Sequence, residues 1–340
     1  MDPSANGLYL PPTFGSAIVS ADSFLDDVTW FRSLLTARGV RLNDVSYFNR
    51  CLTDLEDYAR RTAARRVESE KLDAPTFLRE AISAGYLVRT LRRAERRDAA
   101  SWEAIADHWL PIFTGSDVGL IEFRPTKNND ARNTAWEALT AALLAEFATD
   151  VRPGEPDIVM QYRGGTFGVA CKVLHSDKPE KHIHRIVEGA KQLEGSACET
   201  GLVLVNVSAL LDHGAFFQVA GADPDGVTRY LGLSSPDHIE ELKRQIDRIA
   251  DAFTTKSMLE RVTFDRKTGL PRNKTLAIGV VAQTVAGLHG AVPAVFTVVK
   301  PIRCRRIETV EEDFLTRLNH GAQTAFTYRP SVPPIVILPK

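Results

Sequence analysis

Two short apolar runs joined by a tight turn constrain the fold of this chain more than any other segment. The runs read PDIVMQY and TFGVACKVL, and Arg163-Gly164-Gly165 lies between them. Both runs are rich in β-branched and aromatic residues, and a glycine pair of this kind favours a hairpin turn. The segment from residue 156 to residue 174 is therefore predicted to form an antiparallel hairpin.

The residues after this hairpin predict that the sheet continues. PEKHIHRIVEGAKQLEG has helical spacing and starts at Pro179, a residue suited to a first helical turn. The run from Gly201 to Ser208, GLVLVNVS, is a continuous apolar stretch of strand length, as expected of a strand buried on both faces. Strand, helix and strand at this spacing predict a right-handed parallel crossover. The expected fold is an α/β domain with a mixed sheet.

Two charged residues of the hairpin are expected to meet on one face of the sheet. Side chains alternate along a strand, so Ala170 and Lys172 share a face and Cys171 lies on the other. In a paired hairpin, the face of Lys172 also carries Asp157. An acid beside a lysine on neighbouring strands is an arrangement from which a metal-dependent phosphodiesterase builds its site. A second carboxylate would be expected at the position that Ala170 occupies.

From about Asn133 to Ser208, the chain resembles the core of the PD-(D/E)xK nuclease superfamily, which includes many restriction and repair endonucleases. That core runs helix, strand, strand, strand, helix, strand. Its pattern places an acid in the first helix, Pro-Asp on one strand and Asp/Glu-x-Lys on the next. The matching residues here are Glu137, Asp157 and Ala170-Cys171-Lys172. The resemblance implies a restriction-endonuclease-like mixed sheet flanked by helices and preceded by a helical N-terminal region.

The resemblance also implies roles for individual residues. Asp157, Glu137 and the backbone carbonyl of Cys171 would hold Mg²⁺ or Mn²⁺, cations that take oxygen ligands. Lys172 would orient or activate the attacking water and stabilise negative charge. Gln192 lies on the following helix, where several branches of the superfamily carry a glutamine near the site. The alternative for Gln192 is an ordinary exposed helix glutamine.

Competing interpretations remain open for two of these positions. Thr134 and Glu137 have capping-box spacing, so the carboxylate of Glu137 could close a helix start instead of binding a metal. Ala170 has a methyl group where the pattern has an acid, and a methyl group cannot bind a cation. The chain is then either an active nuclease whose motif acid has been replaced, or a natural pseudonuclease.

The first third of the chain is predicted to be helical and is rich in arginine. From about Ser23 to Phe113, apolar residues recur at three- and four-residue spacing. The arginines in question are Arg60, Arg61, Arg65, Arg66, Arg89, Arg92, Arg93, Arg96 and Arg97. One interpretation is a solvated helix face paired with nearby acids. The other is a surface that contacts phosphate, because the arginine fork matches phosphate geometry.

Composition excludes several classes of protein. The formal net charge is −1, so any nucleic-acid surface has to be a local patch. No apolar run reaches the roughly 18 residues that span a bilayer, and the first residues lack the features of a secretory signal. The four cysteines have no C-x-x-C spacing, which argues against a zinc site and against a disulfide framework. A cytoplasmic location without a membrane partner is expected.

Three segments and one activity follow from these patterns. The expected boundaries are 1–123 for a helical region that binds nucleic acid or a partner, 124–235 for the nuclease-like core, and 236–340 for a C-terminal α/β extension packed on that core. The expected activity is that of a Mg²⁺-dependent DNA endonuclease, inactivated at Ala170 and by analogy restriction-like or a phage-defence effector. The alternative is a non-catalytic pseudonuclease that binds nucleic acid or acts as a scaffold. Expected partners are DNA and either a second copy of the chain or a protein of a defence system.

Overall fold

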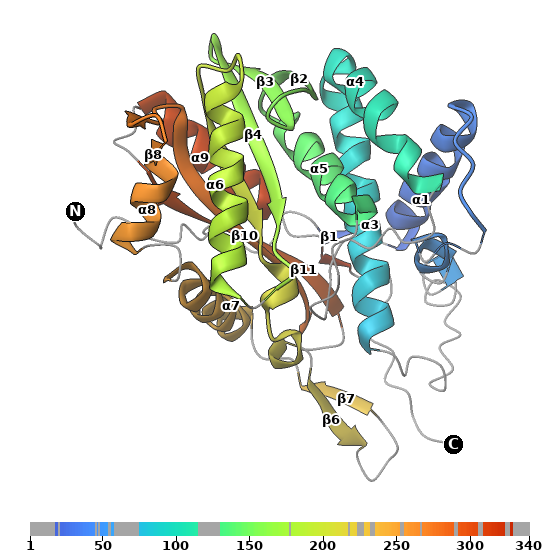
Figure 1. Cartoon of the computed structure of the whole chain (residues 1–340). Coiled ribbons are helices and arrows are strands. Elements are labelled where there is room, and N and C mark those ends of the chain that lie inside the picture. Colours follow the sequence, from blue (N-terminus) through green and yellow to red (C-terminus); the bar gives the residue numbers. More distant parts are fainter. Residues whose placement is uncertain are drawn as a thin grey trace, which may run out of the picture.

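The structure is a computed structural model of the 340-residue chain. It describes residues 18–19, 21–44, 46, 48–53, 56–57, 75–114, 130–176, 178–216, 218–222, 228–231, 235–251, 255–265, 267–288, 292–304, 309–323 and 327–328. These residues form an α/β fold in which helices cover both faces of one mixed sheet (Figure 1). The predicted fold class is confirmed.

The main sheet has eight strands in the order β1-β12-β11-β10-β5-β4-β3-β2. Their bounds are β1 Ile18–Val19, β2 Thr149–Pro153, β3 Ile158–Tyr162, β4 Gly165–Val173, β5 Thr200–Asn206, β10 Thr275–Leu288, β11 Val292–Arg303 and β12 Thr327–Tyr328. The central strands β4, β5 and β10 are parallel, whereas β2, β3 and β4 form an antiparallel meander and β10 and β11 a long antiparallel pair. Two separate hairpins pair β6 (Gln218–Ala222) with β7 (Thr228–Leu231) and β8 (Phe264–Asp265) with β9 (Leu270–Pro271).

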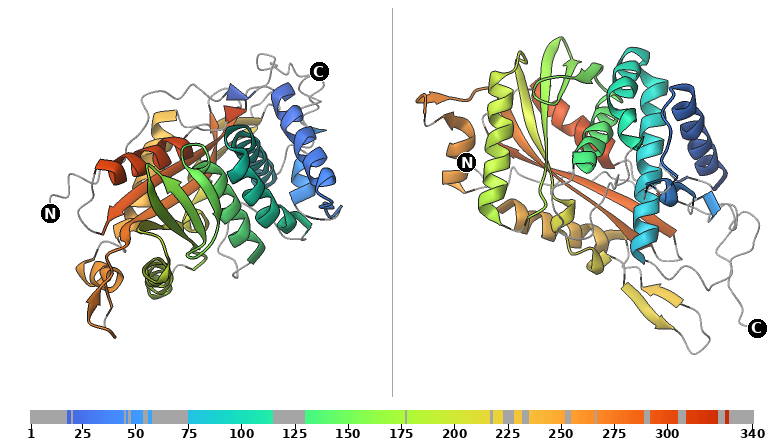
Figure 2. Two further views of the ribbon diagram at one scale, coloured as in Figure 1. Left: turned by 90° about the horizontal axis from the view of Figure 1, so that it is seen from above. Right: turned by 45° about the vertical axis from the view of Figure 1, so that its right-hand side comes forward.

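The two faces of the sheet carry separate sets of helices (Figure 2). One face is covered by α3 (Pro75–Arg97), α5 (Asp130–Leu144) and α9 (Thr309–Gln323), with α1 (Ala21–Ala37) and α4 (Ala99–Trp109) packed beside them. The other face is covered by α6 (Pro179–Gly195), α7 (Ser235–Asp251) and α8 (Lys256–Thr263). Each set buries its own apolar cluster against the sheet. Short 3-10 turns lie at Leu110–Thr114, Ser208–Leu210 and His213–Phe216.

The predicted hairpin and crossover are both present. Strand β3 pairs antiparallel with β4, and the turn between them has positive φ at Arg163 (49°) and Gly164 (85°), as a two-residue hairpin turn requires. Strand β5 then pairs parallel with β4 after helix α6. Strands β10 and β11 extend this same sheet through β5, so the chain beyond residue 236 adds strands to the sheet of the core.

The described parts of the N-terminal third are mainly helical and include α1, α3 and α4 together with the short strand β1. Four of the nine predicted arginines, Arg60, Arg61, Arg65 and Arg66, lie outside the described residues. Among the described helices, none combines the length and the apolar composition needed to cross a membrane.

Candidate active site

Asp157 and Lys172 meet at the edge where β3 begins. Ile158 pairs with Val169, so Asp157 lies opposite Ala170 on the neighbouring strand. The ammonium nitrogen of Lys172 is 3.2 Å from Oδ2 of Asp157. The Lys172 side chain is 8% exposed and that of Asp157 is 18% exposed, so the ion pair is largely shielded from water.

The Asp157 carboxylate is held from one side only. Its Oδ2 atom also accepts a hydrogen bond from the backbone N–H of Cys171, at 2.7 Å. Its Oδ1 atom makes no hydrogen bond to any described residue, so its lone pairs are open to a further ligand. Burial raises the pKa of Asp157, while Lys172 and the Cys171 N–H act in the opposite direction.

Glu137 is a second buried carboxylate beside this pair. Burial raises the pKa of Glu137, and the charge of nearby Asp157 raises it further, whereas Trp109 and Lys172 lower it. Its Oε2 atom accepts a hydrogen bond from the indole Nε1–H of Trp109, at 3.4 Å. The charge of Lys172 acts on both carboxylates, although only Asp157 forms an ion pair with it, and with both carboxylates ionised the cluster carries net negative charge. Such a cluster attracts a cation.

The capping-box interpretation of Glu137 is wrong. Helix α5 begins at Asp130, so Thr134 and Glu137 lie inside the helix. The Thr134 hydroxyl donates to the carbonyl of Asp130 within the first turn, at 2.9 Å, and is not the helix cap. The helix starts earlier than the pattern suggested, which leaves the Glu137 carboxylate available to the site.

Cys171 presents its backbone N–H to Asp157 and its side chain to the face of the sheet that α5 covers, the helix that also carries Glu137. Its side chain is 7% exposed and packs in the cluster on the α5 side. Burial and the nearby carboxylates of Asp157 and Glu137 raise the pKa of the Cys171 thiol well above its usual range. A buried thiol whose pKa is raised is a poor nucleophile and a poor thiolate ligand. The carbonyl of a strand residue points to the same side as its N–H, so that of Cys171 is directed toward the Asp157 edge.

No protein-family model, curated protein or solved structure matches the chain. The chemistry of the site therefore follows from its own side chains.

Ala170 is packed tightly beneath helix α6 and is fully buried. A Cβ atom built on Gly189 of that helix would lie 3.2 Å from the Ala170 Cβ and 2.8 Å from a methyl group of Val203. Position 170 thus lies at the closest approach of α6 to the sheet. In the described ranges, no group of three or more His, Cys, Asp or Glu side chains is arranged to hold a metal ion.

Gln192 is half-buried on α6, one turn beyond Gly189. Its Oε1 atom is buried and has no hydrogen-bond partner in the described part of the chain. Gln192 shares a side of the helix with Glu188 and Arg185, which form an ion pair of 3.2 Å. This environment differs from that of an ordinary exposed glutamine, and the role of Gln192 at the site stays a prediction.

Three of the N-terminal arginines are engaged within the fold. Arg89 and Arg92 both bind the carboxylate of buried Asp27, at 2.8 and 2.6 Å. Arg93 binds Glu146, which follows α5, at 2.6 Å. These guanidinium groups tie α3 to α1 and to the end of α5. The acids that pair with these three arginines come from other elements of the fold, and contact of the arginines with phosphate stays a prediction. Arg96 and Arg97 are exposed.

Sequence reasoning missed Trp109 as a neighbour of the site. It lies on α4, and 28 positions separate it from Glu137. A buried tryptophan next to an acid has no spacing pattern, so only the packing of α4 against α5 reveals the contact. The only sequence signal is that a buried indole N–H needs an acceptor.

Proposed function

We propose that this chain has the architecture of a Mg²⁺- or Mn²⁺-dependent DNA endonuclease whose activity is limited by Ala170. The observation that supports it is the buried ion pair between Asp157 and Lys172, with Glu137 beside it. An acid and a lysine of the hairpin with a second acid from α5 suit phosphodiester hydrolysis, because the reaction needs a held cation and a positive charge near the phosphate.

The residues present fit a hard divalent cation. Asp157 Oδ1 and Glu137 Oε1 make no hydrogen bond to the described residues, and the Cys171 carbonyl is directed to the same edge. Oxygen atoms of this kind are the ligands that Mg²⁺ and Mn²⁺ prefer. When bound, the cation would polarise a phosphate and lower the pKa of a coordinated water. Mg²⁺ keeps several waters, so two protein carboxylates suffice to hold it.

The other residues have supporting roles. Lys172 holds Asp157 ionised and presents positive charge where the phosphate would lie. The Cys171 N–H fixes one oxygen of Asp157, which leaves the other free. The fold keeps this cluster largely shielded from water, which strengthens each electrostatic contact.

A second function is favoured by the environment of Ala170. A fully buried alanine beneath α6 is a good core residue, and it leaves the site one carboxylate short. A chain of this kind would bind nucleic acid or act as a scaffold without cleaving it. Phosphate contacts do not depend on the missing acid, so DNA binding is expected under either proposal.

Ala170→Glu, with Ala170→Gln as its isosteric neutral control, separates the two functions. The nuclease proposal expects Mg²⁺- or Mn²⁺-dependent DNA cleavage by the Ala170→Glu chain only, and loss of that cleavage when Lys172→Ala is added. Circular dichroism establishes that each variant is folded. A folded Ala170→Glu chain that cleaves neither duplex nor single-stranded DNA with either cation would favour the non-catalytic function.

A cytoplasmic location is part of the proposal. Cys51, Cys171, Cys198 and Cys304 form no disulfide bonds, and three of them are buried. Free cysteines are typical of proteins that work in a reducing compartment.

A further inference from the structure

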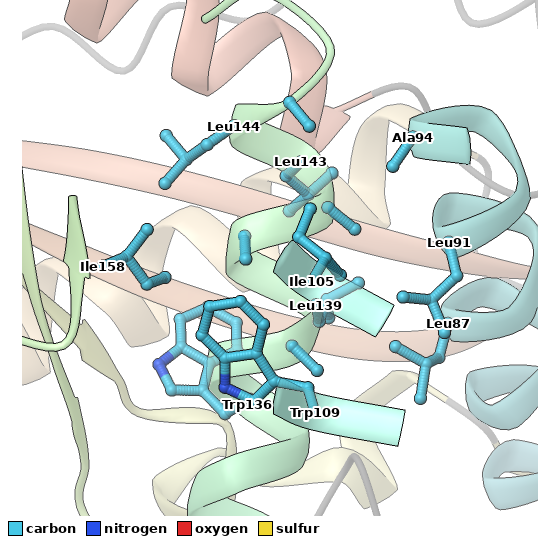
Figure 3. Close-up of a cluster of buried hydrophobic side chains, with 14 of the residues drawn as sticks. Leu87, Leu91, Ala94, Ile105, Trp109, Trp136, Leu139, Leu143, Leu144 and Ile158 are labelled. Atoms are coloured by element: carbon cyan, nitrogen blue, oxygen red, sulfur yellow. The ribbon is translucent and has the colours of Figure 1, made fainter. Parts of the chain in front are cut away.

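Among the described residues, Trp109 is the one side chain from outside the predicted core that donates a hydrogen bond to a candidate ligand. It is fully buried at the end of α4 (Figure 3). Its indole Nε1–H donates to Oε2 of Glu137 over 3.4 Å. Water cannot easily replace this donor, because the indole has no exposure to solvent.

The indole is well suited to orienting a carboxylate. It is a donor only, and its rigid ring is fixed by the surrounding core. A hydrogen bond to an ionised acceptor is stronger than one between neutral groups. By engaging Oε2, the indole restricts the rotation of the carboxylate, and Oε1 keeps its lone pairs for another ligand. Partners of this kind orient the groups that bind a metal and tune its affinity.

We infer that Trp109 is a positioning residue that fixes the Glu137 carboxylate for cation binding, an inference that rests on the proposed function. It makes α4, part of the helical region before the core, necessary for the geometry of the site. A chain that kept only the nuclease-like segment would lack this donor. The N-terminal helices would therefore contribute to the site itself as well as to stability.

Trp136 provides a matched control. It lies next to Glu137 in sequence, is only 4% exposed, and belongs to the same apolar cluster as Trp109. Its Nε1 atom is buried and has no hydrogen-bond partner among the described residues. Trp109→Phe and Trp136→Phe each remove a buried indole, but only the first removes a donor to Glu137.

The first experiment uses the cation-free chain and nuclear magnetic resonance. The four tryptophans give four indole N–H signals, which single Trp→Phe variants assign. Glu137→Ala removes the acceptor, so the Trp109 indole proton is expected to move upfield and to exchange faster with solvent. The signals of Trp30 and Trp102 are expected to stay in place. An unchanged Trp109 signal would overturn the inference.

The second experiment measures Mn²⁺ binding to the full chain by electron paramagnetic resonance. Loss of an outer partner of this kind weakens metal affinity by roughly tenfold or more, so Trp109→Phe is expected to raise the Kd by at least about tenfold. Trp136→Phe is expected to match the unchanged chain. Equal losses in both variants, or no loss in Trp109→Phe, would refute the positioning role. If the unchanged chain binds no Mn²⁺, the proposed function fails, and the indole signal alone decides whether Trp109 holds Glu137.

Discussion

Replacing Lys172 by methionine tests the electrostatic core of the site. The substitution keeps an unbranched side chain and removes the charge that compensates Asp157. At the 3.2 Å separation of the pair, an effective dielectric constant of 20 gives a gross attraction of about 5 kcal/mol. The desolvation of Lys172 offsets part of this attraction, and Asp157 keeps the Cys171 N–H. A net loss of about 2–3 kcal/mol in the free energy of unfolding is expected at pH 8.

The loss should depend on pH in a defined direction. Burial already raises the pKa of Asp157, and removal of Lys172 raises it further. A carboxyl group whose pKa is higher in the folded state binds protons more tightly there, so stability rises as the pH falls through that pKa. The Lys172→Met chain should therefore recover much of its lost stability in mildly acidic solution, where Asp157 takes up a proton.

Urea denaturation at pH 8 and pH 5 measures both effects, with Asp157→Asn and the Asp157→Asn/Lys172→Met double variant completing the cycle. The expected coupling energy at pH 8 is about 2 kcal/mol, within the usual range for contacting residues. If the loss is the same at both pH values, or if the single effects add without coupling, the pair does not have the electrostatic role argued for it.

Three further perturbations have defined outcomes. Glu137→Gln should raise the free energy of unfolding by about 1 kcal/mol at neutral pH, because it removes a buried charge near that of Asp157. The gain should vanish in acid, where Glu137 is protonated, and urea denaturation at several pH values measures it. Arg92→Ala should lower the free energy of unfolding by about 1–2 kcal/mol, since it removes one of the two partners of buried Asp27. Replacement of the exposed Arg96 by alanine should change that free energy by no more than about 0.5 kcal/mol, and parallel urea titrations compare the two variants. Gly189→Ala should lower the thermal midpoint and the free energy of unfolding, the latter by about 1–3 kcal/mol, because the added Cβ would collide with the side chains of Val203 and Ala170. An unchanged thermal midpoint would show that α6 can move away from the sheet.

Local chemistry made the hairpin predictable. The turn at Arg163 and Gly164 and the alternation along the two strands depend only on neighbouring residues. The face shared by Asp157 and Lys172 follows from that alternation, and the distance of 3.2 Å agrees with it. The crossover through α6 was likewise predictable, because helix and buried strand succeed each other at short spacing.

Contacts between distant segments were not predictable in the same way. The parallel pairing of β10 with β5 joins residues about 75 positions apart, and no local pattern specifies that partner. The partners of Arg92 and Arg93 come from α1 and from the end of α5, whereas the sequence suggested acids close by in the chain. The capping-box error has a different cause. The polar segment before Thr134 continues the helix back to Asp130, and helix boundaries are weakly specified by sequence.

The packing at Ala170 determines how an acid at that position would behave. Gly189 of α6 packs against Ala170 and Val203, so a longer side chain at 170 requires these neighbours to shift, and Asp157 lies opposite it on the neighbouring strand. A glutamate there would add a buried negative charge opposite Asp157, and without a cation this charge destabilises the fold more than a neutral glutamine of the same shape does. Mn²⁺ should therefore raise the thermal midpoint of Ala170→Glu more than that of Ala170→Gln, because a ligand that binds the folded state stabilises it. If Mn²⁺ shifts neither variant and both are destabilised equally, position 170 is a core site, and the non-catalytic function is the better account of the chain.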